Sequence, residues 1–153
     1  MKLVHVQSEE QLLAARHLFL EYADWLGVDL CFQGFQHELD GLPGEYAPPE
    51  GRLLLAVVDG RAVGCVALRK LEQGVCEMKR LYVQPAHRHN GLGRRLAEGI
   101  IGEARTIGFV RMRLDSLTSL KEAARLYQSL GFTEIPPYRH NPLLGAVFLE
   151  IVL

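Results

Sequence analysis

The sequence has little that would place the protein in a specialised class of location or partner. It has no apolar run approaching the roughly 20 residues that a membrane-spanning helix needs. Its first residues, Met1 to His5, lack the apolar stretch of a secretory signal. The formal net charge of −1 gives no global support for a nucleic-acid-binding surface. We therefore expect a cytoplasmic protein that binds neither membranes nor nucleic acids.

Patterns of metal ligands and disulfides are also missing. The three cysteines, Cys31, Cys65 and Cys76, are odd in number and lack the spacing of a zinc site. The six histidines are scattered, and the close pair His87 and His89 has no cysteine or HExxH companion. We expect reduced, partly buried thiols and no metal.

The composition is that of an ordinary globular domain, with 153 residues, 48% hydrophobic and 23% charged. Ser8 followed by Gln11 is typical of a helix capping box, and Asp59-Gly60 is typical of a tight hairpin. The apolar spacing predicts strands over residues 3–6, 52–58, 63–68, 75–83, 110–114 and 146–153. It predicts helices from residue 8 to 26, around 35–39, and over 92–107 and 120–130. This order indicates one mixed α/β domain spanning residues 1–153.

A glycine-containing turn follows the strand at 75–83 and opens the next helix. The first N–H groups of a helix have no internal partner, and glycine lets an anion approach them closely. Arg88 adds a planar charged fork suited to phosphate oxygens. A P-loop or a dinucleotide fingerprint would need further residues that are absent, so the turn alone fits either an anion cradle or an ordinary loop. The turn consists of Arg88, His89, Asn90, Gly91, Leu92 and Gly93.

Three segments together resemble the GNAT superfamily of acyl-CoA-dependent N-acyltransferases. Residues 77–83 resemble the family's fourth strand, and residues 88–93 match its Q/R-x-x-G-x-G/A pyrophosphate motif. Residues 123–132 resemble its "A..LY...GF" segment, and the order of elements agrees over nearly the whole chain. Two positions depart from the pattern: His89 stands where many members have Gly, and Leu120 where many have an Asn that contacts the coenzyme.

The resemblance implies a GNAT-like α/β fold, with a central mixed, mostly antiparallel sheet flanked by helices. It implies that two strands splay apart at the cofactor cleft, between residues 81–83 and 114–116. It also implies acetyl-CoA as the acyl donor, with no metal. The main chain of Leu81, Tyr82 and Val83 would meet pantetheine. The pyrophosphate would lie against Arg88, His89, Asn90, Gly91, Leu92, Gly93 and Arg94.

The resemblance also gives roles to catalytic groups. Tyr127 matches the family's proton donor to the leaving thiolate, although its place on an apolar stripe also fits a core tyrosine. Glu77 lies where some members place a general base, with a water chain or Asp115 as the alternatives. A backbone N–H near Leu81 would stabilise the oxyanion. We expect direct transfer rather than an acyl group carried on Cys76.

The acceptor is expected to be an amine: a small amine, an amino acid, or an amino group of a peptide or protein. A homodimer is plausible by family analogy. The rival hypothesis is a non-catalytic module that binds or senses acyl-CoA. The choice of acceptor is expected to depend on the first two helices, the loop at 41–51 and the turn at 136–142. Candidate lining residues there are Tyr22, Asp24, Glu45, Tyr46, Tyr138 and Asn141.

Overall fold

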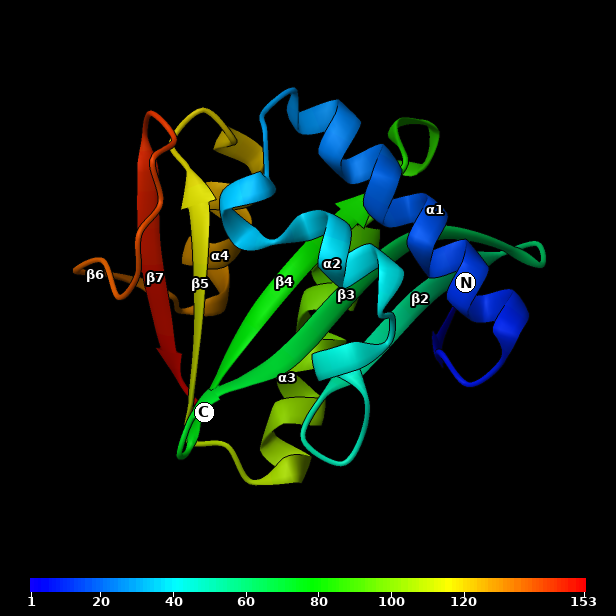
Figure 1. The fold of residues 1–153 in the computed structure, drawn as a ribbon, viewed down its shortest axis with the longest axis horizontal. Coiled ribbons are helices and arrows are strands. Elements are labelled where there is room, and N and C mark those ends of the chain that lie inside the picture. The colour runs from blue at the N-terminus through cyan, green and yellow to red at the C-terminus, as the bar shows by residue number, and fades with distance from the viewer.

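A seven-stranded sheet forms the centre of the computed structural model, which describes residues 1–153 apart from the side chain of Phe32. The strand order is β1-β2-β3-β4-β5-β7-β6 (Figure 1). Only β4 and β5 pair in parallel; the other neighbours are antiparallel. The strands are β1 (Lys2–His5), β2 (Arg52–Val58), β3 (Arg61–Glu72), β4 (Val75–Val83), β5 (Arg111–Leu117), β6 (Thr133–Ile135) and β7 (Ala146–Val152).

Helices cover both faces of the sheet. One face carries α1 (Glu9–Leu26) and α2 (Phe35–Asp40), and the other carries α3 (Leu92–Ile107) and α4 (Lys121–Leu130) (Figure 1). Because side chains alternate along a strand, β3 contributes Cys65 and Ala67 to the core under α1 and Val66 and Leu68 to the core under α3. Three short 3₁₀ turns complete the chain: η1 (Cys31–Gln33), η2 (Gly44–Tyr46) and η3 (Pro85–His87).

Local signals in the sequence determine several of these boundaries. The Ser8 hydroxyl accepts from the Gln11 N–H at 3.1 Å, and the Gln11 side chain accepts from the Ser8 N–H, which confirms the capping box. Asp59 and Gly60 both have positive φ, as a two-residue hairpin loop of type I′ requires. Gly108 closes α3 in the left-handed conformation, as expected.

The structure differs from the sequence prediction in the C-terminal part. Residues 133–135 form strand β6 at the edge of the sheet, paired with β7, whereas no strand was expected there. Three residues are too short for a periodic pattern, and their strand exists only because β7 offers a neighbouring edge. β3 also runs to Glu72, beyond the expected end at residue 68.

Candidate active site

A gap opens where the two parallel strands part. β4 and β5 pair at only three positions, and the last of these joins Glu77 to Arg113. Beyond it, β4 stays with β3 while β5 stays with β7 as far as Leu117. The strands therefore separate between residues 78–83 and 114–117, which is where the resemblance places the splay.

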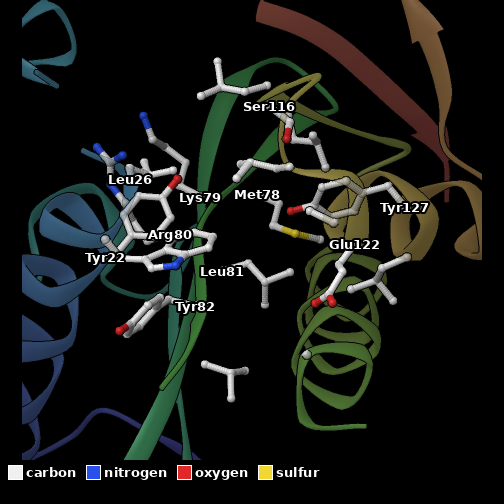
Figure 2. Close-up of a pocket in the computed structure, with 18 of the residues that line it drawn as sticks. Tyr22, Leu26, Met78, Lys79, Arg80, Leu81, Tyr82, Ser116, Glu122 and Tyr127 are labelled. Carbon is white, nitrogen blue, oxygen red and sulfur yellow. The ribbon is translucent and has the colours of Figure 1, made fainter. Parts of the chain in front are cut away.

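A cavity of about 830 Å³ occupies this gap. Its walls come from β4, β5, α1, the start of α3 and α4 (Figure 2). Two parts of the wall differ in chemistry. We call them the turn end, formed by Arg88, His89, Gly91, Leu92, Gly93 and Arg94, and the charged end, formed by Gln33, Lys79, Arg80, Asp115 and Asn141.

The turn end presents backbone. Gly91 precedes α3 with a φ of 78°, and no side chain caps the helix start. The first backbone bond of α3 runs from the Arg95 N–H to the Gly91 oxygen at 3.1 Å, so the N–H groups before Arg95 have no partner within the helix. A Cβ on Gly93 would meet only Leu126, at 3.9 Å, so this position is open. His89 has a φ of 68°, a conformation that glycine would adopt at lower cost.

Arg88 links the turn to the strand. Its Nε donates to the Val83 oxygen at 2.8 Å, and its guanidinium lies 4.5 Å from the centre of the Trp25 ring. The Arg88 side chain is therefore held in place by protein contacts, and only its remaining N–H groups are available to a ligand. Sequence alone could not show this contact, because Trp25 lies on α1, far away in the chain.

A β-bulge interrupts β4 beside the cavity. Cys65 on β3 faces Tyr82 and Ala67 faces Lys79, so the single residue between them on β3 faces both Arg80 and Leu81. Arg80 takes up the extra length with a φ of 61°. Because of this insertion, Lys79 and Arg80 both point to the α1 side, whereas Leu81 packs against the α3 core.

Tyr127 reaches the cavity from α4. Figure 2 shows its hydroxyl pointing from α4 toward Met78 and Leu81. The ring packs edge-on against Phe132 at 5.6 Å. Burial raises the pKa of the hydroxyl, and Tyr22 and Asp115 raise it further. The group is therefore neutral and carries a proton at physiological pH.

Glu77 lies outside the cavity wall, on the α1 side of β4, and is fully buried. One carboxylate oxygen accepts from Arg69 Nε at 2.9 Å. The other accepts from the Tyr138 hydroxyl at 2.6 Å and lies 2.5 Å from a terminal nitrogen of Arg139. Both oxygens of Glu77 thus already have donors. This arrangement is compatible with a structural ion pair as well as with a general base.

The charged end is a dense ionic network. Arg80 makes two hydrogen bonds of 2.9 Å to the Glu38 carboxylate, and its guanidinium lies 5.9 Å from the centre of the Tyr22 ring. Asp115 accepts from Arg139 at 3.1 Å and from Asn141 at 3.0 Å. The opposing placement of Lys79, Arg80 and Tyr22 against Tyr127 is visible in Figure 2.

Most of the predicted site residues line one cavity. Tyr127 and nine of the ten residues expected at the cofactor do so, whereas Asn90 and Glu77 do not. Of the residues expected at the acceptor, Tyr22 and Asn141 line it, and Glu45 and Tyr46 line a smaller neighbouring cavity of about 350 Å³.

Sequence reasoning missed Gln33, Lys79 and Arg80 at the charged end. A lysine and an arginine in succession along a strand normally point to opposite faces, so nothing in the sequence placed both in the site. A glycine or proline in β4 could have indicated the bulge, but Arg80 and Leu81 form it instead.

Other kinds of site are not seen in the part of the chain that the structure describes. Within it, no group of three or more His, Cys, Asp or Glu side chains could hold a metal ion. No helix among the described residues is long and apolar enough to cross a bilayer.

Comparison with known proteins identifies the family of this chain. The model of the acetyltransferase (GNAT) family matches residues 13–132. The chain is 42% identical over 148 residues to an uncharacterized N-acetyltransferase of Schizosaccharomyces pombe, covering 95% of this chain and 91% of the relative. The chain therefore belongs to the GNAT family of acetyltransferases, as the three sequence segments indicated.

Solved structures share the fold. An acetyltransferase of Streptococcus agalactiae superposes with a TM-score of 0.82 at 20% identity, covering 99% of this chain and 98% of that one. The PaiA N-acetyltransferase of Thermoplasma acidophilum, solved in complex with coenzyme A, has a TM-score of 0.78 at 18% identity and covers each chain fully. The expected mixed sheet with flanking helices is thereby confirmed.

Proposed function

We propose that this protein transfers the acetyl group of acetyl-CoA directly to an amine, in the cavity between β4 and β5. The observation that carries the proposal is the coincidence, in one cavity, of an uncapped helix start and a protonated tyrosine. Membership of the GNAT family supports acetyl-CoA as the donor. In the transfer, the amine nitrogen forms a bond to the acetyl carbon, the carbon–sulfur bond breaks, the amine gives up a proton and the thiolate takes one.

Coenzyme A is proposed to lie along the turn end. The free N–H groups at the start of α3 suit the pyrophosphate, since they carry the positive end of the helix dipole. The main chain of Leu81, Tyr82 and Val83 would run beside pantetheine like an added strand. The Val83 oxygen already accepts from Arg88, so Arg88 is proposed to hold the strand end against the turn as well as to face phosphate.

The β4 bulge is proposed to supply the oxyanion site. A bulge leaves a backbone group outside the ladder, and here the Arg80 oxygen accepts from the Cys65 thiol at 3.2 Å. That contact fixes the peptide between Arg80 and Leu81. The N–H of Leu81 would then be held in place for the oxyanion without reorganising during the reaction.

Tyr127 is proposed as the proton donor to the leaving thiolate. Its hydroxyl lines the cavity and points toward Leu81, and burial keeps it protonated. A positioned acid contributes most where charge develops on the leaving group.

Three candidates exist for the base that takes the amine proton: Glu77, Asp115 and water. Both carboxylates already have a donor on each oxygen, so their positions distinguish them. Glu77 stays a prediction, but it is fully buried and does not line the cavity, which favours another role. Asp115 lines the cavity, and we favour it, alone or through a water.

The test is to titrate acetyl-CoA into the protein calorimetrically and then to follow release of free CoA over a panel of amines. Ligand at 100 times its Kd should add about 2.7 kcal/mol of stability. Binding with amine-dependent CoA release supports the enzyme. Binding without release across the panel supports a non-catalytic acyl-CoA-binding module, and no binding rejects both.

A cytoplasmic location is proposed as well. It is supported by three free cysteines, two of them buried, because thiols persist in reducing compartments. The homodimer remains a prediction by family analogy, and sedimentation would test it.

A further inference from the structure

Lys79 is a buried ammonium without a carboxylate of its own. Its side chain is 6% exposed. Its Nζ donates to the Gln33 amide oxygen at 3.3 Å and lies 3.9 Å from the nearest oxygen of Glu77. A lysine has three donors to satisfy, so these two contacts leave it under-partnered.

The cations around it have better partners. Arg69 and Arg139 approach Glu77 at 2.9 and 2.5 Å, so that one carboxylate serves three cations, including the lysine. Each arginine also has a second carboxylate: Glu45 at 2.7 Å for Arg69 and Asp115 at 3.1 Å for Arg139. The carboxylates of this network equal its cations in number, but each arginine has two within hydrogen-bond distance, whereas the lysine has none closer than 3.9 Å.

The neighbouring arginine of β4 does not compete for a ligand. Arg80 is held by both oxygens of Glu38 and also donates to the Gln33 amide oxygen at 2.8 Å. Two cations thus share that one amide oxygen, which fixes the orientation of the Gln33 side chain beside Lys79.

Lys79 is placed where a ligand can reach it. It lines both the large cavity and the smaller one, as does Gln33, so it stands at their junction. An unmade bond at a buried donor is costly, and an anion at this junction would offer an acceptor to the Lys79 ammonium.

We infer that the acceptor carries a carboxylate as well as its amine, and that Lys79 binds this carboxylate at the junction of the two cavities. The inference rests on the proposed function and names its substrate class. A purely cationic acceptor, such as a polyamine, would bring a second positive charge to this buried ammonium and offer no acceptor for its N–H groups. The large cavity also has apolar side chains in its wall that could contact a hydrocarbon part of the acceptor; they include Leu26, Leu30 and Leu143.

The experiment uses acceptor pairs that differ only in the carboxylate. We would measure kcat/KM for CoA release with leucine against leucinamide, phenylalanine against phenylalaninamide, and 4-aminobutyrate against its amide, with putrescine and butylamine added. The amino acid amides have the more easily deprotonated amines, so amine basicity cannot produce a preference for the acids. The wild-type protein should prefer the acid in at least one pair by about 10- to 100-fold, the range of a charge-assisted hydrogen bond.

Variants then assign the preference to the lysine. Lys79→Met should bring the ratio to near one, mainly through KM, and Lys79→Arg should keep part of it. Lys70→Met is the matched control, because Lys70 is a partly exposed cation on β3 paired with Glu50 at 3.1 Å; it should leave the ratio unchanged. Calorimetric binding of N-acetylleucine, but not N-acetylleucinamide, to the CoA-loaded protein gives a readout independent of turnover.

The outcomes separate the two proposals. Equal rates for acids and amides, or a preference that survives in Lys79→Met, would overturn the carboxylate site while leaving the acetyltransferase standing. Loss of acetyl-CoA binding by Lys79→Met would also overturn it, since the lysine would then serve the donor. Wild-type protein that binds acetyl-CoA but acetylates no amine would reject the enzyme and this inference together.

Discussion

The two ends of the cavity offer different kinds of groups to a ligand. At the turn end the groups available to a ligand are mainly backbone N–H groups, exposed because Gly91 and Gly93 leave space. At the charged end they are side chains from four separate segments, tied together by ion pairs such as Arg80 to Glu38 and Arg139 to Asp115. The first end suits a ligand part common to a whole family, whereas the second suits a part that varies.

The difference also predicts how each end responds to mutation. A backbone cradle is hard to remove but easy to obstruct, so single changes should weaken binding without unfolding the chain. An ionic network shares its partners, so the loss of one charge leaves several others uncompensated. The following predictions test that contrast, beginning with the largest effect.

Glu77→Gln should lower the free energy of unfolding by about 3–5 kcal/mol, because the buried Lys79 and the partly buried Arg69 and Arg139 would lose the carboxylate that they share. Urea denaturation measures it. Glu72→Gln is the matched control: Glu72 pairs with Arg113 at 3.2 Å but is 58% exposed, and its loss should cost at most about 1 kcal/mol. Equal stability of Glu77→Gln and wild type would contradict the network.

The same variant addresses the base. If Glu77 takes the amine proton, Glu77→Gln shifts the pH–rate profile; if Asp115 does, the shift appears in Asp115→Asn instead. A profile of Glu77→Gln that superimposes on the wild type, scaled for folded protein, would place the base elsewhere.

Tyr127→Phe should lower turnover by about 100-fold, equivalent to about 2.7 kcal/mol, with acetyl-CoA affinity unchanged. The hydroxyl is lost while the edge-on packing against Phe132 remains. Thr106→Val removes an exposed hydroxyl that bonds within α3 to the Gly102 oxygen and lines neither cavity, and it should leave turnover close to wild type. Unaltered turnover in Tyr127→Phe with a good amine would reject the acid role.

Sequence reasoning reached the turn end because its signals are local. The strand, the glycines and the helix start follow one another within about twenty residues, and their order alone predicts where the N–H groups point. The capping box at Ser8 and the hairpin at Asp59 were predictable for the same reason.

The charged end was out of reach for physical reasons. Lys79 and Arg80 share a face only because β4 carries a bulge, and that bulge is a property of its pairing with β3. The contacts from Gln33 and Arg139 come from segments about 45 to 60 residues away along the chain. Strand β6 escaped prediction similarly, since its three residues depend on β7.

The pH dependence of stability sharpens the contrast at the charged end. The pKa of Lys79 is lowered from 10.5 to about 8, chiefly by burial and also by the charges of Arg80 and Arg139, against the opposing charges of Glu77 and Glu38. The charged form is thus disfavoured by folding, so stability is lower below pH 8 and rises as the lysine deprotonates. Between pH 8 and 10 this contributes about 2 kcal/mol.

The measurement is the difference in unfolding free energy between wild type and Lys79→Met across that range. Subtraction cancels the titration of the tyrosines and cysteines that both proteins share. A difference that does not change between pH 8 and 10 would mean that the ammonium is solvated rather than buried in the network.

The smallest effect belongs to the turn end. Gly93→Ala should weaken acetyl-CoA binding by about tenfold, or about 1.4 kcal/mol, because its Cβ would enter the space proposed for pyrophosphate. The fold should tolerate it, since that Cβ would lie 3.9 Å from Leu126. Gly102→Ala, in the same helix with nothing within 4 Å, should raise stability by about 0.5–1 kcal/mol and leave binding unchanged. If both variants bind acetyl-CoA like the wild type, the backbone cradle is not where the phosphates lie. If only Gly93→Ala binds it more weakly, obstruction of the cradle without destabilisation of the fold is demonstrated.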